Sequence, residues 1–343
     1  MSFPDDINEG HWIQQVRALL NRSRRQSGYN RYTQPAPDAE NQQSPWNSAL
    51  YALVYRWFDL DMAGDELKSA VAHQVQAGDD AGMVPGRVFW ASPGSEMQHA
   101  DLTAPPLLAY ATVQVYHFSG DTSLLERLYP KLVAWHEWFD RRRDDDADNL
   151  VRIDYPDEFI VGGGAVNVNA IRAADLDALA HIASDMDDPG EAAHWETRAK
   201  AVEAALHAQP VDLYERVNAT LLTMMVGRGV SPSDAAEMVS RVSAQANDKL
   251  FPWLEGSDNP ISMVDNWLIY LALRRYGFHA LASDIAEKSF RLVEENGFHQ
   301  FYDSVTGKGL GTPDHGTSAL ALDLLFREKQ GKIPKPKCLQ EFD

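Results

Sequence analysis

The stretch from Asn266 to Gly311 constrains the fold of this chain more than any other part of it. It begins as a helix with an apolar stripe that includes Trp267, Leu268 and Leu271, and a Tyr-Gly pair stops that helix. A second amphipathic helix follows and ends at Asn296-Gly297, before a loop rich in aromatic residues. We therefore expect a helical hairpin whose helices support a functional loop.

The rest of the chain repeats this pattern of paired helices. Helical spacing of apolar residues predicts helices at 8–26, 46–58, 62–76, 103–118, 121–143, 167–186, 189–208, 216–226, 231–245, 262–276, 280–295 and 314–327. Longer irregular segments separate the pairs at 26–45, 77–102, 144–165, 247–262 and 297–313. This alternation predicts an all-α fold, and specifically a closed (α/α)6 toroid of six helical hairpins with function in the long loops. A helical solenoid is the structural alternative, and it ranks second because no fixed sequence period recurs.

The domain prediction follows from the absence of a linker between the two halves of the sequence. We expect residues 1–343 to form a single toroid domain, with tails at about 1–7 and 331–343. With 343 residues, of which 44% are hydrophobic, the chain is long enough to bury a large core.

Charge and cysteine content exclude several classes of function. A net charge of −19, from 50 acidic against 31 basic residues, repels nucleic acid and anionic membranes. The single Cys338 excludes an internal disulfide and a cysteine-rich zinc site. The opening MSFPDDINEG lacks a signal-peptide pattern, and no apolar run is long enough to span a membrane. We expect a cytoplasmic protein that acts on a small molecule without metal or cofactor, and a homo-oligomer is compatible with this sequence.

Five motifs occur in a fixed order along the chain. They read PWNSALYALVYRWFD, LTAPPLLAYA, LYPKLVAWHEWFDRRRD, NWLIYLALRRYG and NGFHQFYDSVTGKGLG. In these motifs the chain resembles the mannosylglycerate and glucosylglycerate hydrolases and glycoside hydrolase family 63, from about Trp46 to Leu325. The resemblance implies a toroid with a sugar-binding cleft where the long loops meet.

The resemblance also implies two catalytic carboxyl groups, and the sequence departs from the family at both. Inverting glycosidases use an acid and a base about 6.5–9.5 Å apart. The family's general acid is an Asp, and its position falls at about Gly162, within IDYPDEFIVGGGAVNVNA. The family's general base is a Glu, and its position is occupied here by Gln300. A neutral amide cannot take a proton from water. Asn47 and Ala104 stand where the family has Asp and Gln, so the resemblance predicts a diverged active site.

The candidate catalytic residues are those that remain near these positions. Glu158 and Asp157 could supply a relocated acid, although solvated loop carboxylates are the simpler interpretation. Asp101 precedes a predicted helix and is either an N-cap or a catalytic acid. His299 adjoins Gln300 and, like His315 in the closing loop, is a candidate proton carrier because histidine titrates near neutrality.

The candidate substrate-binding residues are mostly aromatic and belong to the long loops or to the helix ends beside them. Aromatic rings can stack on sugars, although ordinary core packing explains any one of them equally well. We predict substrate contacts for Trp46, Asn47, Phe89, Trp90, Trp267, Tyr302 and His315, and consider Trp253 and Phe301 for the same wall.

Three functions remain open from these residues. The first is a carbohydrate-active hydrolase of a small glycoside whose acid and base have diverged. The second is an isomerase, lyase or terpenoid-type cyclase that transfers protons through His, Glu or Asp in an aromatic cleft. The third is a non-catalytic sugar-binding protein.

Overall fold

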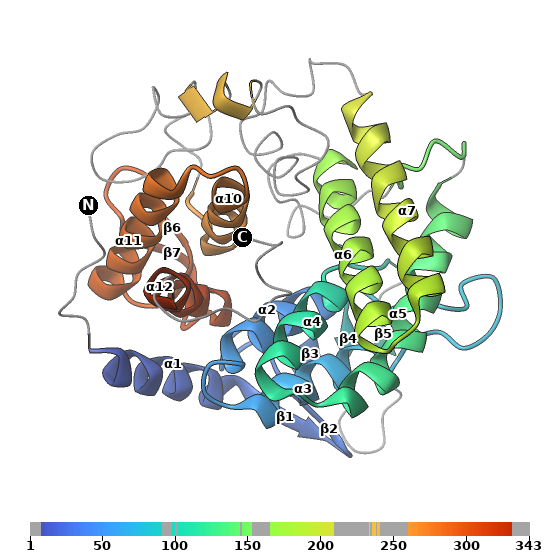
Figure 1. Ribbon diagram of the computed structural model, residues 1–343. Helices are drawn as coiled ribbons and strands as arrows, with labels where there is room; N and C mark the ends of the chain where they lie inside the picture. Colours follow the sequence, from blue (N-terminus) through green and yellow to red (C-terminus); the bar gives the residue numbers. More distant parts are fainter. Residues whose placement is uncertain are drawn as a thin grey trace. The chain divides into compact units, whose positions relative to one another are not determined.

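The computed structural model describes residues 8–90, 98–99, 102–144, 146–152, 165–208, 233, 235–237, 239–240 and 260–330 (Figure 1). These residues are mostly helical, as predicted. The chain divides into two compact units. Unit 1 comprises Met1–Arg22, Val161–Gly163 and Pro210–Asp343, and unit 2 comprises Ser23–Ile160 and Gly164–Gln209.

Unit 2 is built from pairs of helices that are consecutive in the sequence. Its described helices are α2 (Pro45–Tyr55), α3 (Leu60–Ala70), α4 (Leu108–Ser119), α5 (Thr122–Arg143), α6 (Ala165–Asp185) and α7 (Pro189–His207). α2 packs on α3, α4 on α5 and α6 on α7, which confirms three of the predicted helix pairs. α2 is buried along nearly its whole length, because its sequence is apolar on every face.

Side-chain caps explain where several of these helices begin. Asp121 is the N-cap of α5 and accepts a hydrogen bond from the Ser123 amide (3.0 Å), which confirms the start of the helix predicted at 121–143. Asp188 caps α7 in the same way through the Glu191 amide, also at 3.0 Å. α3 is capped by Asp59, whose carboxylate accepts from the Met62 amide at 3.1 Å.

The predicted start of α4 at Thr103 is wrong, because the helix begins at Leu108. Two consecutive prolines, Pro105 and Pro106, force each preceding residue out of the helical region, so the chain stays extended before them. Thr103 instead fastens this segment. Its hydroxyl donates to the Val84 carbonyl (2.7 Å) and accepts from the Trp135 indole (2.9 Å).

The segment predicted as a loop at 26–45 contains short strands. β1 (Arg24–Ser27) pairs antiparallel with β2 (Asn30–Thr33), and β3 (Gln42–Gln43) pairs with β4 (Val88–Phe89), which also pairs with β5 (Gln98–His99). β1, β2 and β3 are mostly polar, and all five strands are only two to four residues long, so they show no apolar alternation by which a strand is recognised.

Unit 1 contains helices and a β-hairpin. Its described elements are α1 (Glu9–Ser23, whose last residue is counted with unit 2), α10 (Met263–Arg275), α11 (His279–Asn296), β6 (His299–Tyr302), β7 (Gly309–Pro313), the 3-10 helix η3 (Gly316–Ala319) and α12 (Leu320–Gln330). α10 packs on α11, and α12 packs on both, which confirms the predicted hairpin of residues 262–295. Trp12 of α1 lies against Phe290 of α11, with ring centroids 4.6 Å apart.

The helix predicted from Asp314 starts later than expected. Asp314 has a positive φ of 52° and His315 is extended, so the chain turns through η3 before α12 begins. The predicted helix at 216–226 lies outside the described residues, as does most of the one at 231–245. In the described part of the chain, no helix combines the length and hydropathy needed to cross a bilayer.

Gly82 offers a test of how tightly the loop after α3 packs on α5. Its φ is +97°, and a Cβ there would lie 2.4 Å from the carbonyl oxygen of Ala134 in α5. We expect Gly82→Ala to lower the free energy of unfolding by about 2–4 kcal/mol, since it adds a backbone clash to left-handed strain. Gly78→Ala is the matched control: φ is +81° with no atom within 4 Å, so about 1 kcal/mol is expected. If urea denaturation showed that both variants lose the same free energy of unfolding, the close packing of Gly82 against α5 would be contradicted.

Candidate functional site

The β6–β7 hairpin of unit 1 carries three of the predicted site residues, His299, Gln300 and Tyr302. The strands are antiparallel, with His299 opposite Pro313 and Phe301 opposite Leu310. The register shifts between His299 and Phe301, so Gln300 lies at an irregularity of the ladder. Its side-chain oxygen accepts a hydrogen bond from the Thr312 amide at 3.3 Å. This bond orients the amide group, and the Nε2 group is the donor that remains.

Two glycines of β7 make room for these side chains. A Cβ on Gly309 would lie 2.2 Å from Cδ2 of His299, and a Cβ on Gly311 would lie 2.8 Å from the side-chain oxygen of Gln300. Gly311 also has a φ of +69°, which other residues rarely adopt. The glycines of the TGKGLG motif therefore determine how His299 and Gln300 are held.

Tyr302 anchors the hairpin to its surroundings. The ring is fully buried, and its hydroxyl donates to the Gly297 carbonyl (2.8 Å) and accepts from the His299 amide (3.1 Å). Ser318 of η3 donates to the carbonyl of His299, and backbone hydrogen bonds join Tyr302 to Ile261 in both directions. Burial raises the pKa of Tyr302, so the hydroxyl stays protonated. These contacts give Tyr302 a structural role, and its contact with substrate stays a prediction.

Trp267 is likewise enclosed within unit 1. Its ring is fully buried in α10, and its indole N–H donates to Asp323 of α12 at 2.6 Å. The same carboxylate oxygen accepts from Arg327 at 2.8 Å. These bonds hold α10 against α12, and a substrate contact by Trp267 remains a prediction.

His315 is buried beside the start of η3. Its Nδ1 lies 2.8 Å from the hydroxyl of Thr317, and burial lowers the pKa of His315 to about 4. The imidazole therefore stays neutral throughout the range near pH 7 in which an ordinary histidine titrates, and the proton-carrier interpretation assumed that ordinary titration. A neutral imidazole still offers one hydrogen-bond donor and one acceptor.

Four predicted substrate contacts lie in unit 2. Trp46 and Asn47 occupy the first turn of α2, where Trp46 is buried and Asn47 partly exposed. Trp90 is a core residue: it stacks on Tyr32 with ring centroids 5.0 Å apart. Phe89 of β4 is partly exposed. Of these four, Asn47 and Phe89 present side-chain surface in the unit as described.

Several predicted residues lie outside the described part of the chain. They are Asp101, Asp157, Glu158, the glycine at 162 and Trp253. Their assignments stay predictions.

Glu66 of α3 is a polar group at this end of α2 that was not predicted. It is fully buried, and Oε2 accepts from the hydroxyl of Ser48, the residue after Asn47, at 2.8 Å. The amide of Gln43 donates to Ser48 (2.9 Å) and to Ser69 (2.6 Å). Burial raises the pKa of Glu66 to about 8, so the carboxyl is protonated at neutral pH. The burial of Glu66 could have been predicted from the sequence, because helical spacing puts it on one face with the apolar residues Met62, Ala63, Leu67 and Ala70.

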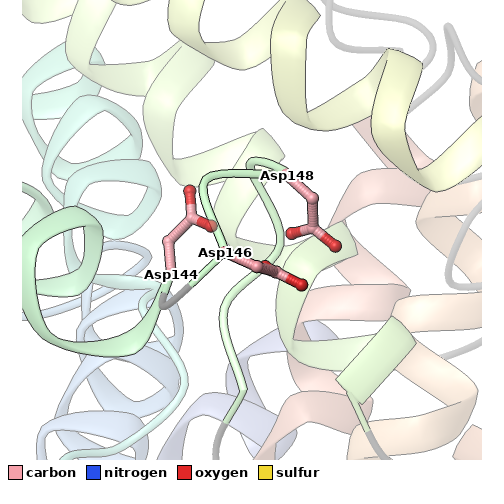
Figure 2. A group of neighbouring side chains, drawn as sticks. All are labelled: Asp144, Asp146 and Asp148. Atoms are coloured by element: carbon pink, nitrogen blue, oxygen red, sulfur yellow. The ribbon is translucent and has the colours of Figure 1, made fainter.

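Three carboxylates gather in the turn after α5, within the irregular segment predicted at 144–165. Asp144, Asp146 and Asp148 each bring one oxygen within 4.8 Å of the others (Figure 2). Carboxylate oxygens suit hard cations such as Ca²⁺. However, the guanidinium of Arg152 already donates to Asp146 (2.6 Å) and Asp148 (2.7 Å). The single positive charge of Arg152 is thus shared between two of the three carboxylates, and the cluster carries no argument for a bound metal.

Comparisons with known proteins point to one family. Residues 40–158 match the family described as the mannosylglycerate hydrolase MGH1-like glycoside hydrolase domain. Mannosylglycerate hydrolase MGH2 of Selaginella moellendorffii is 23% identical, over 86% of this chain and 82% of the relative. The mannosylglycerate hydrolase of Rubrobacter radiotolerans is also 23% identical, over 86% of this chain and 93% of the relative.

Solved structures extend the similarity to the fold. The structure of a GH63 mannosylglycerate hydrolase from Thermus thermophilus in complex with glucose matches with a TM-score of 0.76 and 22% identity, covering 92% of this chain and 100% of that one. A rhamnosidase from Klebsiella oxytoca with rhamnose bound matches with a TM-score of 0.69 and 13% identity, over 96% of this chain and 66% of that one.

The buried carboxyl of Glu66 predicts a specific dependence of stability on pH. Its folded pKa of about 8 lies above the ordinary value of 4.5, so its stabilising contribution is complete below pH 4.5 and is lost as the pH rises through 8. We expect Glu66→Gln to remove this loss of stability. Its free energy of unfolding should exceed that of the wild type by about 2–4 kcal/mol at pH 8.5 and differ little from it at pH 4.5. Urea denaturation at both pH values measures the two free energies.

The control for that experiment is Glu294→Gln, which makes the same chemical change on the exposed surface of α11. This variant should keep the wild-type dependence of stability on pH. If Glu66→Gln also showed the wild-type dependence of stability on pH, the carboxyl of Glu66 would be ionised in the folded protein at pH 7.

Proposed function

We propose that this chain, which belongs to a family related to glycoside hydrolase family 63, is an enzyme that hydrolyses a small glycoside. The observation that carries the proposal is the extent of the match. Relatives described as mannosylglycerate hydrolases align over most of both chains, and the solved structure with glucose is covered completely. Mannosylglycerate and glucosylglycerate are therefore the first substrates to test.

The proposal includes the architecture that the sequence predicts. Residues 1–343 would form one ring of six helical hairpins, with the long loops gathered at one end. Consecutive helices pack in pairs within each unit, which supports this arrangement. The similarity in fold to a sugar-bound hydrolase and a sugar-bound rhamnosidase supports it as well.

Within this function, the hairpin residues would orient the substrate. Gln300 stands at the position of the family's base, where an amide donates and accepts hydrogen bonds but does not titrate near pH 7. Because the Thr312 amide holds its oxygen, Gln300 would present its N–H group to a sugar hydroxyl or a water molecule. Asn47 and Phe89 remain proposed substrate contacts on the grounds given by the sequence. Glu158 and Asp157 remain the proposed source of a relocated acid.

A second function, sugar binding without turnover, is favoured by the same amide. If no other group replaces the carboxylate at position 300, the site binds a glycoside and leaves the bond intact. Turnover distinguishes the two functions, since a binding protein would show saturable heat of binding with no release of glycerate.

We expect the purified protein to release D-glycerate from mannosylglycerate or glucosylglycerate, and Gln300→Glu to raise kcat by about 10-fold or more. A general base contributes roughly 10²–10⁴ in rate, so a carboxylate restored at this position has room to accelerate the reaction. Gln15→Glu makes the same change on α1 and is the control; it should leave kcat unchanged. If neither the wild type nor Gln300→Glu turned over either substrate, the proposed hydrolysis of these glycosides would be contradicted.

A further inference from the structure

The end of α4 and the end of α6 bring two histidines and a carboxylate together in unit 2. α4 packs on α6 (Figure 1), and His117 lies in the last turn of α4. His181 and Asp185 are one turn apart at the end of α6, so helical spacing puts both side chains on one face. Nε2 of His117 is 3.6 Å from Oδ2 of Asp185. None of these residues belongs to the site proposed for the substrate.

The imidazole of His117 has polar atoms that the fold does not satisfy. Its side chain is only 3% exposed, and neither ring nitrogen has a hydrogen-bond partner among the residues that the structure describes. The 3.6 Å between Nε2 and the carboxylate of Asp185 is too long for a hydrogen bond. A buried polar group without a partner is costly, and an ion held between these two side chains would remove that cost.

The distance between the two groups suits a metal ion. Zinc lies about 2.0–2.1 Å from an imidazole nitrogen and about 2.0–2.2 Å from a carboxylate oxygen, in tetrahedral geometry. Two donors of one such ion are then about 3.3–3.5 Å apart, which is close to the 3.6 Å between His117 and Asp185. The side chain of Asp185 is 29% exposed, so an ion can reach the pair from solvent.

His181 is placed to supply a third donor. Burial lowers the pKa of His117, the carboxylate of Asp185 opposes this shift, and the charge of protonated His181 lowers the pKa further. The two imidazoles are therefore close enough for their charges to repel each other. The donor atoms of the three residues do not all lie within 4.8 Å of one another, so binding includes a rotation of the partly exposed His181 side chain.

The helix ends around these side chains favour a cation. α4 ends at Ser119 and α6 at Asp185, and the last carbonyl groups of a helix carry partial negative charge. Imidazole nitrogens suit Zn²⁺, Cu²⁺ and Ni²⁺, whereas Ca²⁺ and Mg²⁺ prefer oxygen donors. Two histidines and one carboxylate, with one position left for water, are a known ligand set of zinc.

We propose that His117, His181 and Asp185 form a binding site for one divalent transition-metal ion of the zinc type, which fastens the end of α4 to the end of α6. Nε2 of His117 and a carboxylate oxygen of Asp185 bind the ion from the two helices. His181 provides the second imidazole, and water fills the remaining position. The site differs from the expectation of a protein without metal, and it does not depend on the proposed hydrolysis.

The test uses the full chain, freed of metal with EDTA and then dialysed against ZnCl₂ at pH 7.5. We expect Asp185→Asn and His181→Gln each to weaken Zn²⁺ binding at least 10-fold, because loss of even an outer partner of a metal site costs about 10–100-fold. Asp187→Asn, in the exposed turn after α6, and His207→Gln, at the exposed end of α7, make the same chemical changes. These two controls should bind Zn²⁺ as the wild type does.

Thermal unfolding provides a second measurement. Zn²⁺ should raise the Tm of the wild type and of both controls, because a ligand that binds only the folded state stabilises it. The Tm of Asp185→Asn and of His181→Gln should not respond to Zn²⁺. The inference is overturned if the wild type binds no Zn²⁺, or if these two variants bind it as tightly as the wild type. If neither variant folded without metal, the two side chains would have a structural role of their own, and the inference would be overturned as well.

Discussion

The burial of apolar helix faces against the next helix in the chain is the constraint on which the rest of this structure depends. In unit 2 the pairs α2/α3, α4/α5 and α6/α7 bury these faces, and in unit 1 α12 covers both α10 and α11. Side chains such as Trp135, Trp138 and Trp267 are removed from water completely. Hydrophobic burial of this extent supplies the free energy that offsets the cost of enclosing polar groups.

Polar groups inside these units are arranged to connect elements. Trp267 and Asp323 link α10 to α12, and Tyr302 links the hairpin to η3. His136 of α5 and Asp175 of α6 are both fully buried, 2.9 Å apart, and the other oxygen of Asp175 accepts from the Tyr110 amide of α4. Buried polar groups are expected to be hydrogen-bonded.

Local signals in the sequence predicted much of the fold. Asp121 and Ser262 were recognisable helix starts because their side chains satisfy amides within three residues. The start of α4 was misplaced because the steric effect of two adjacent prolines outweighed the helical pattern after Thr103. The strands β3 and β4 were missed because backbone pairing between distant segments, such as Gln43 with Val88, produces no periodic pattern in either segment.

The amino-acid sequence by itself determined the helical class, the position of the closing loop and the neutral chemistry of Gln300, because these depend on residue type and near neighbours. Only the tertiary structure decided that Glu66 holds a proton at neutral pH, that His315 does not, and that the ring nitrogens of His117 lack a hydrogen-bond partner among the described residues. The reason is physical. Desolvation depends on which atoms surround a group, and those atoms come from elements that are far apart in the chain.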